Sequence, residues 1–394
     1  MALTSQTSNE VINNSEKKLI SKAAVLDGVE GKFNIIEYEV PEPKEGEFIL
    51  RTEYAGVCGT DVHIYYGHLD TIEYPIVLGH EFCGIIEKLG SEQLFDSNGV
   101  PVKEGDRVVV VPGASCGECY YCQIAKTPTR CTNTKAYGFL PNKNPYLLSG
   151  GFSQYVHIKN KNTAFFKTDL DPEIAVLTEP LSICVHGFQR AGGVKFGSTV
   201  LVQGTGAIGL GAIAFAKRSG AAKVIAVGGP KRRLELAKKM GADVVIDIED
   251  IKDPEERIRM VKAETKGGRG PDMVVECAGF PGALPEGLTY LSDSGEYVEL
   301  GHFTDVGSVA MNPHWHILRK NANIRGVWGS DVEHMQMTLS IIENMELPYD
   351  ELVTHKLPLN RIEDAILSMS KKGYTLDGKE QVIKIAIDPW KDFE

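Results

Sequence analysis

The sequence predicts an α/β protein with two domains, one rich in β-strands and one built on a doubly wound parallel sheet. Three observations predict this fold. The chain has 394 residues, more than one ordinary core holds. Residues 21–181 consist of short apolar runs that Gly and Pro interrupt, which is typical of strands. Residues 182–329 alternate strand-like with helical segments, which is typical of a parallel sheet.

The first 20 residues are polar and charged, and we expect them to form a mobile extension. They lack the apolar segment of a secretory signal, so the sequence predicts a cytoplasmic protein.

The strand-rich region contains a donor set that suits zinc. Cys58 begins the run CGTDVH, and His80-Glu81 follows about twenty residues later. A thiolate, an imidazole and a carboxylate would leave the fourth position of a tetrahedral zinc open, as in catalytic sites. Thr60 and His63 lie between them and are candidates for relaying a proton to solvent.

Four cysteines cluster further along the chain and predict a second, structural zinc site. They are Cys116, Cys119, Cys122 and Cys131. Four closely spaced thiolates can fill the coordination sphere of zinc. A pair of disulfides is the alternative, which a cytosolic protein makes less favourable.

A glycine-rich motif opens the nucleotide-binding region. The apolar run 200–203 is followed at once by G-x-G-x-x-G and then by a helical pattern over 210–217. This order is typical of dinucleotide-binding folds, in which the pyrophosphate approaches a helix N-terminus. The motif residues predicted to bind the cofactor are Gly204, Gly206, Ala207, Ile208 and Gly209.

Further strands are predicted downstream, with a helix over 231–240. The strands cover 223–227, 243–246, 272–276, 296–300 and 323–328. Ligands of such sheets bind at the carboxyl ends of strands, so Ala278 and Gly301 are expected to border the cofactor. We expect His302 to have a structural role or to lie at the rim of the site.

The end of the second strand bears on which nicotinamide nucleotide is bound. An acidic residue there would bind the ribose 2′-hydroxyl of NAD, and a basic one the 2′-phosphate of NADP. The chain has Gly228 there, followed by the bases Lys231, Arg232 and Arg233. This favours NADP, although the bases are also what an exposed helix start would carry, so NAD and NADP both stay open.

Composition excludes two classes of partner. The net charge of −11 argues against nucleic acid and anionic membranes, which bind basic surfaces. No apolar run approaches the roughly 20 residues that span a bilayer.

Together these motifs resemble the zinc-containing medium-chain alcohol dehydrogenases, especially their sorbitol and threonine dehydrogenase-like branch. The resemblance extends from about Lys22 to Asp388. It implies a GroES-like catalytic domain and a Rossmann domain, with residues 330–394 returning to the catalytic domain. It also implies that Cys58, His80 and Glu81 hold the catalytic zinc.

The resemblance implies two further sets of roles. Glu179, in the run TEPLS, matches an additional acidic ligand, and one of Glu81 and Glu179 would act directly and the other through water. Thr60 and His63 match proton-relay positions, with the cofactor ribose between them.

The chain departs from the family pattern in three other places. The gap between Cys122 and Cys131 is one residue longer than usual, which a loop can absorb. Residues 91–103 and 139–149 look like insertions, and the second could reach the substrate cleft.

The function expected from these features is reversible oxidation of an alcohol to a ketone or aldehyde, with hydride transfer to NAD or NADP. The resemblance favours a secondary alcohol, a polyol or an amino alcohol as substrate, and a homodimer or homotetramer. One alternative is a lyase or epimerase that retains its nicotinamide for internal redox. Another is a non-enzymatic zinc-binding interaction protein.

Overall fold

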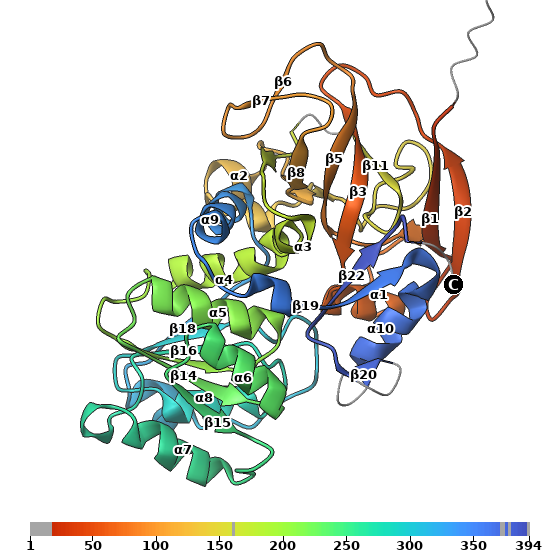
Figure 1. The fold of residues 1–394 in the computed structure, drawn as a ribbon. Helices are drawn as coiled ribbons and strands as arrows, with labels where there is room; N and C mark the ends of the chain where they lie inside the picture. Colours follow the sequence, from red (N-terminus) through yellow and green to blue (C-terminus); the bar gives the residue numbers. More distant parts are fainter. Residues whose placement is uncertain (1–17, 160–161, 371–374, 377–379, 392–394) are drawn as a thin grey trace, which may run out of the picture.

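The computed structural model describes residues 18–159, 162–370, 375–376 and 380–391. Two parts lie side by side, a strand-rich part and a layered part of helices around a parallel sheet (Figure 1). The two-domain α/β prediction is confirmed. Of the extension expected at residues 1–20, residues 1–17 lie outside the described residues, and the first strand already begins at Ile20.

The strand-rich part is organised around a seven-stranded sheet. Its order is β12-β8-β5-β3-β22-β19, and β11 also pairs with β3. The strands are β3 (Phe48–Gly56), β5 (Glu81–Leu89), β8 (Arg107–Val110), β11 (Tyr155–Ile158), β12 (Phe165–Lys167), β19 (Val353–Pro358) and β22 (Lys384–Asp388). Because β22 pairs with β3, the end of the chain completes a sheet that the first 90 residues begin.

Smaller elements surround this sheet. A three-stranded sheet has the order β2-β1-β4, and three strand pairs stand apart from it. The strands are β1 (Ile20–Leu26), β2 (Phe33–Glu39), β4 (Ile76–Val77), β6 (Leu94–Phe95), β7 (Pro101–Val102), β9 (Gly113–Ala114), β10 (Lys135–Ala136), β20 (Thr375–Leu376) and β21 (Glu380–Gln381). The helices are α1 (Gly59–Tyr65), α2 (Tyr120–Gln123), α3 (Pro172–Ala175) and α10 (Ile362–Ser370).

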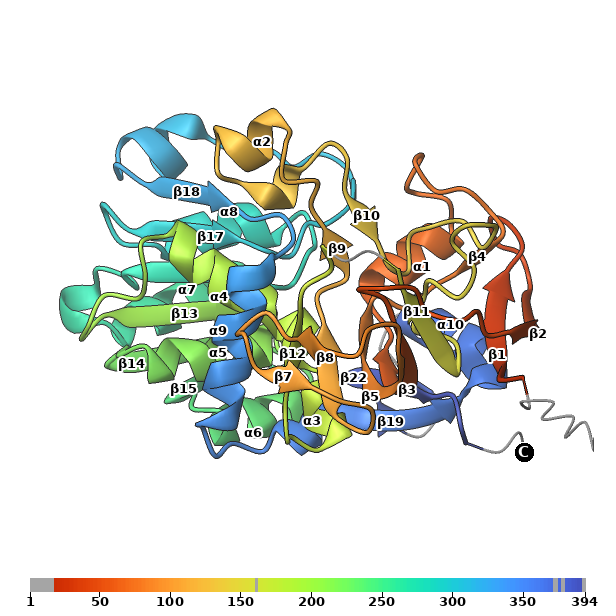
Figure 2. The same ribbon diagram turned by 90° about the horizontal axis from the view of Figure 1, so that it is seen from above.

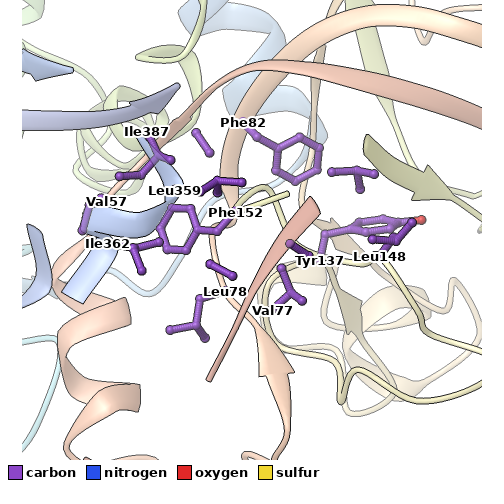
Figure 3. Close-up of a cluster of buried hydrophobic side chains, with 14 of the residues drawn as sticks. Val57, Val77, Leu78, Phe82, Tyr137, Leu148, Phe152, Leu359, Ile362 and Ile387 are labelled. Atoms are coloured by element: carbon purple, nitrogen blue, oxygen red, sulfur yellow. The ribbon is translucent and has the colours of Figure 1, made fainter. Parts of the chain in front are cut away.

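One hydrophobic core joins strands of both sheets to α1 and α10. Figure 3 shows side chains from β4, β5 and β22 packing with residues from the loops and from α10. The residues labelled there are Val57, Val77, Leu78, Phe82, Tyr137, Leu148, Phe152, Leu359, Ile362 and Ile387. Val57 and Leu78 belong to this core and directly precede the segments that carry Cys58 and His80, so the core fixes the backbone of both.

The layered part contains six parallel strands in the order β15-β14-β13-β16-β17-β18. In chain order this is 3-2-1-4-5-6, the arrangement of dinucleotide-binding folds. The strands are β13 (Thr199–Gln203), β14 (Lys223–Gly228), β15 (Val244–Asp247), β16 (Met273–Glu276), β17 (Glu296–Glu299) and β18 (Asn323–Gly326). All six strands predicted for this region are present, with ends displaced by at most two residues.

Helices cover both faces of this sheet, as Figures 1 and 2 show. They are α4 (Thr178–Arg190), α5 (Ala207–Arg218), α6 (Lys231–Lys239), α7 (Pro254–Ala263), α8 (Ala283–Tyr290) and α9 (Val332–Glu343). Successive strand residues point to opposite faces. Accordingly, Val200 and Val202 pack in the core with α4, α5 and α6, whereas Leu201 packs in the core with α7 and α8.

Helix α4 connects the two parts. It runs without a break through residues 181 and 182, where the sequence suggests a domain boundary. It contacts α5 and α9 and also reaches β5, so the connection is a packed helix rather than a flexible linker.

The two segments that look like insertions fold differently. Residues 91–103 contain the β6–β7 pair, and the buried Asp96 carboxylate accepts hydrogen bonds from its own loop and from the Lys167 amide. The segment 139–149 has Phe139 beside His80, with ring centroids 5.0 Å apart. A separate cavity of about 730 Å³ is lined in part by other residues of this segment, namely Leu140, Asn144, Pro145, Tyr146 and Ser149.

Candidate active site

A single cavity of about 640 Å³ joins the two parts of the molecule. The strand-rich part contributes Val57, Cys58, Gly59, Glu81 and Lys384, and the glycine-rich turn contributes residues 204–208. Residues 228–229, Arg233, Ile248 and Lys252 line the far end. The predicted metal site and the predicted nucleotide site therefore open into the same space.

The structure brings Cys58, His80 and Glu81 together, with one ligand atom of each within 4.8 Å of the others. Cys58 directly precedes α1, and Glu81 begins β5. Gly79 has a φ of +89°, a left-handed conformation that turns the chain sharply before His80. The donor set of thiolate, imidazole and carboxylate fits zinc, so the residues present suit the metal.

Asp61 supports two of these residues. Its Oδ2 accepts a hydrogen bond from the Cys58 amide at 2.8 Å, and its Oδ1 lies 3.7 Å from Nδ1 of His80. Burial lowers the pKa of His80, but Asp61 and Cys58 outweigh it and place the pKa well above the usual 6.5. With Asp61 beside Nδ1, Nε2 is the ring nitrogen that a metal would use, the usual arrangement of a metal-bound histidine.

Lys384 is a site residue that the sequence reasoning missed. It begins β22, is almost fully buried, and pairs with the carboxylate of Glu81. Burial lowers the pKa of Lys384, but the negative charges of Glu81 and Cys58 outweigh burial. The pKa of Lys384 therefore lies above its usual value. The only sequence signal is a lysine within the apolar run VIKIAI.

Glu179 lies near this group but outside the set of atoms within 4.8 Å. It is the second residue of α4. Burial raises its pKa to about 7, with the charge of Glu81 also raising it and those of His80 and Lys384 lowering it. Glu179 therefore lies within electrostatic range of the donor set.

Thr60 and His63 both lie on α1, three residues apart, so they share a face of the helix. The Thr60 hydroxyl lies 3.5 Å from the sulfur of Cys58. The Nε2 atom of His63 lies 3.0 Å from the hydroxyl of Thr304, in the loop after β17. Thr304 is a second contact that the sequence did not reveal, because it joins segments about 240 residues apart.

The four clustered cysteines form a compact sulfur group. The sulfur of Cys119 lies 3.5 Å from that of Cys122 and 3.9 Å from that of Cys131, which is 3.5 Å from that of Cys116. Tetrahedral zinc with Zn–S bonds of about 2.3 Å would hold its sulfurs about 3.8 Å apart. The group therefore fits a fully ligated zinc, and all eight cysteines are free thiols.

The glycine-rich turn has the geometry that a pyrophosphate needs. Gly204 has a φ of +91°, and a side chain there would meet the backbone of Cys277 and Ala278. Gly206 caps α5, and a Cβ added to it would meet nothing within 4 Å. The space beside the helix N-terminus therefore suits a dinucleotide. Gly204, Gly206, Ala207 and Ile208 line the cavity, whereas Gly209 packs against Gly204.

The residues after β14 are divided between the cavity and the solvent. Gly228 and Arg233 line the cavity, and Arg233 donates a hydrogen bond to the carbonyl of Val382. Lys231 and Arg232 are exposed at the start of α6 and are not among the lining residues. Helical geometry explains this division, because consecutive residues point to different sides.

At the carboxyl ends of β16 and β17, Ala278 lines the cavity, whereas Gly301 is not a lining residue and lies against Gly279. Glu276 accepts hydrogen bonds from the amides of Ala278 and Gly279, and His302 is 2.8 Å from Glu299 and 3.4 Å from Glu276. Burial and the nearby Glu299 raise the pKa of Glu276 to about 7. This group fixes the loop that borders the cavity.

Comparison with known proteins agrees with this geometry. A family model described as an alcohol dehydrogenase GroES-like domain matches residues 44–168, and one described as a zinc-binding dehydrogenase matches residues 207–344. Among curated relatives, a 5-exo-hydroxycamphor dehydrogenase of Pseudomonas putida is 34% identical, over 84% of this chain and 91% of its own. An L-threonine 3-dehydrogenase of Bacillus subtilis is 33% identical, over 93% of this chain and 99% of its own.

A solved structure shares the whole architecture. An alcohol dehydrogenase from Thermotoga maritima superposes with a TM-score of 0.87 at 30% identity, covering 94% of this chain and 99% of that one. None of the helices in the described part of the chain is long and apolar enough to cross a membrane. The family models, the curated relatives and the shared fold together confirm the resemblance: the chain belongs to the zinc-containing medium-chain alcohol dehydrogenases.

Proposed function

We propose that the protein reversibly oxidises a secondary alcohol, a polyol or an amino alcohol to the corresponding carbonyl compound. The observation that carries this proposal is the shared cavity, which Cys58 and Glu81 line at one end and the glycine-rich turn at the other. The two relatives named above act on hydroxycamphor and threonine, both of which carry the hydroxyl on a secondary carbon.

Cys58, His80 and Glu81 would hold the catalytic zinc, with Glu179 close by. Glu81 is the better candidate for direct ligation because its carboxylate belongs to the compact donor set. Cys116, Cys119, Cys122 and Cys131 would hold the structural zinc. Zinc supplies Lewis acidity that lowers the pKa of an alcohol, and a nicotinamide nucleotide accepts the hydride.

Thr60 and His63 would move the proton. The Thr60 hydroxyl is placed beside Cys58, where the substrate alcohol would have to lie, and His63 follows on the same helix face. Burial and the neighbouring His68 lower the pKa of His63, so its imidazole is neutral at neutral pH and can accept a proton.

For the nucleotide we propose that NADP is preferred over NAD. Arg233 and Lys252 line the far end of the cavity, and the chain has glycines where an acid would bind the ribose hydroxyls. Gly209, Gly301, Lys231 and Arg232 would then support the site without lining it.

We also propose that residues 21–181 and 330–394 form one catalytic domain around the Rossmann domain of residues 182–329. The pairing of β22 with β3 supports this division. A cytoplasmic location is supported by the eight free cysteines.

A homodimer or homotetramer is supported by the edge of the six-stranded sheet. Strand β18 is an edge strand, and Ile324 on it is exposed, as are Trp315 and Leu318 in the preceding segment. An open edge with exposed apolar side chains favours pairing with another chain. Light scattering after size exclusion would give the number of subunits.

The test of the function is cofactor reduction by zinc-replete protein, followed in the near ultraviolet, with secondary alcohols, polyols and L-threonine. Each substrate is tested with NAD and with NADP. Turnover that Cys58→Ala abolishes is the expected result. Substrate conversion without net cofactor reduction would instead indicate internal redox with a retained nicotinamide.

A further inference from the structure

Two histidines meet at the end of α1. The chain turns back after Tyr65, and the amide of His68 donates a hydrogen bond to the carbonyl of His63. This turn brings Nδ1 of His68 to 3.1 Å from Nδ1 of His63. Gly67, between them, has a φ of +72°, which makes the tight return possible.

A contact between two imidazole nitrogens at this distance requires a proton on one of them and a lone pair on the other. A hydrogen bond therefore joins the two rings, and the tautomers decide which ring donates it. Burial lowers the pKa of His63, and the neighbouring His68 lowers it further. His63 then returns readily to its neutral form after it has accepted a proton.

The surroundings of the two rings indicate the direction in which a proton would move between them. His63 is half-buried, and Phe303 and Thr304 pack against it from the layered part of the molecule. His68 is exposed, with Tyr66 beside its ring. One ring thus faces the interior and the other faces water.

We propose that His68 is the exit of the proton path, taking a proton from His63 and releasing one to bulk water. This rests on the proposed function, in which alcohol oxidation releases a proton. His63 accepts that proton at Nε2 and donates the proton on its Nδ1 to Nδ1 of His68. His68 then loses the proton on its Nε2 to water, so one proton enters the pair and one leaves it. His68 acts through His63 and does not touch the reacting atoms.

The test compares His68→Ala with His314→Ala, since His314 is also an exposed histidine but lies outside the site. Alcohol oxidation is measured across pH in dilute buffer, with and without added imidazole. For His68→Ala we expect kcat to fall about tenfold near neutral pH, with KM for the alcohol unchanged, because proton transfer through a positioned group contributes at least this much. Added imidazole should restore kcat in His68→Ala and leave His314→Ala and the natural protein unaffected.

A second measurement does not depend on turnover. The pKa of His63 is followed by NMR in histidine-labelled protein, and it should rise when His68 is replaced, because a neighbour that lowers it is gone. Three results in His68→Ala would each overturn the proton exit: an unchanged pKa of His63, an unchanged kcat, or a loss of kcat that imidazole does not restore. Failure of the natural protein to reduce either nucleotide would overturn the proposed function itself, and the exit with it.

Discussion

Lys384 and Glu81 form a buried ion pair beside the candidate zinc ligands, with side chains only 5% and 1% exposed. The two residues come from strands on either side of β3, at opposite ends of the sequence. The contact therefore joins the last strand of the chain to the metal site. A buried carboxylate that loses its partner is strongly destabilising.

Replacing Lys384 by Met should lower the stability of the zinc-free protein by about 3–5 kcal/mol, because Glu81 would be left buried without a counter-charge. Chemical denaturation after chelation measures this. The matched control is Lys356→Met on the neighbouring strand, whose pairing with Glu173 is partly exposed and should be worth about 1 kcal/mol or less. Equal losses in the two variants would show that Lys384 does not support Glu81.

Replacing Cys119 by Ser should remove the structural zinc and leave the catalytic one. Zinc content should fall from two ions per chain to one. The melting temperature should also drop, because metal binding stabilises the segment that contains the four clustered cysteines. Elemental analysis of the dialysed protein gives the count. Cys83→Ala is the control, since this buried cysteine lies outside both clusters. Two zinc ions retained in Cys119→Ser would contradict the four-thiolate site.

The pair of His157 and Glu47 should make stability fall in acid. Burial lowers the pKa of His157 below 6.5, with Glu47 partly opposing this effect. Burial raises the pKa of Glu47, but hydrogen bonds from Lys44 and His157 outweigh it and bring the pKa below 4.5. In both cases the unfolded chain binds the proton more readily. Stability should therefore fall as pH drops below 6.5, and again as it drops through the pKa of Glu47.

The variant Glu47→Gln tests this dependence. It should be less stable than the natural protein at neutral pH and should converge with it at the lowest pH, where the carboxylate of Glu47 is protonated. Urea denaturation across pH measures the difference. Glu45→Gln, an exposed neighbour on the same loop, should follow the natural protein throughout. A constant offset at every pH would mean that the charge of Glu47 is not involved.

The sequence predicted those parts of the site whose residues lie close together in the chain and form a motif. The motif that contains Cys58, the pair His80-Glu81 and the glycine-rich turn each predict a site because their spacing is part of their function. Lys384 and Thr304 could not be predicted in this way. Each reaches the site through a contact between distant segments, and the pairing of β22 with β3 cannot be read from either strand alone. The three basic residues after β14 were predicted together to bind the cofactor. Because consecutive helical residues point to different sides, only Arg233 of the three lines the cavity.

Arg233 provides a direct test of cofactor choice. If the 2′-phosphate of NADP binds at the far end of the cavity, Arg233→Ala should raise KM for NADP about tenfold or more and change KM for NAD much less. The reason is that a hydrogen bond to a charged group contributes about 1.5–3 kcal/mol. Arg232→Ala is the matched control, because Arg232 is exposed on the same helix and does not line the cavity. Initial rates of the natural protein and of both variants with each nucleotide, at a saturating concentration of a substrate found by the activity test, give the six KM values needed. Equal increases in KM for the two nucleotides would indicate that Arg233 acts through its hydrogen bond to Val382 and not on the phosphate, and the preference for NADP would then be wrong.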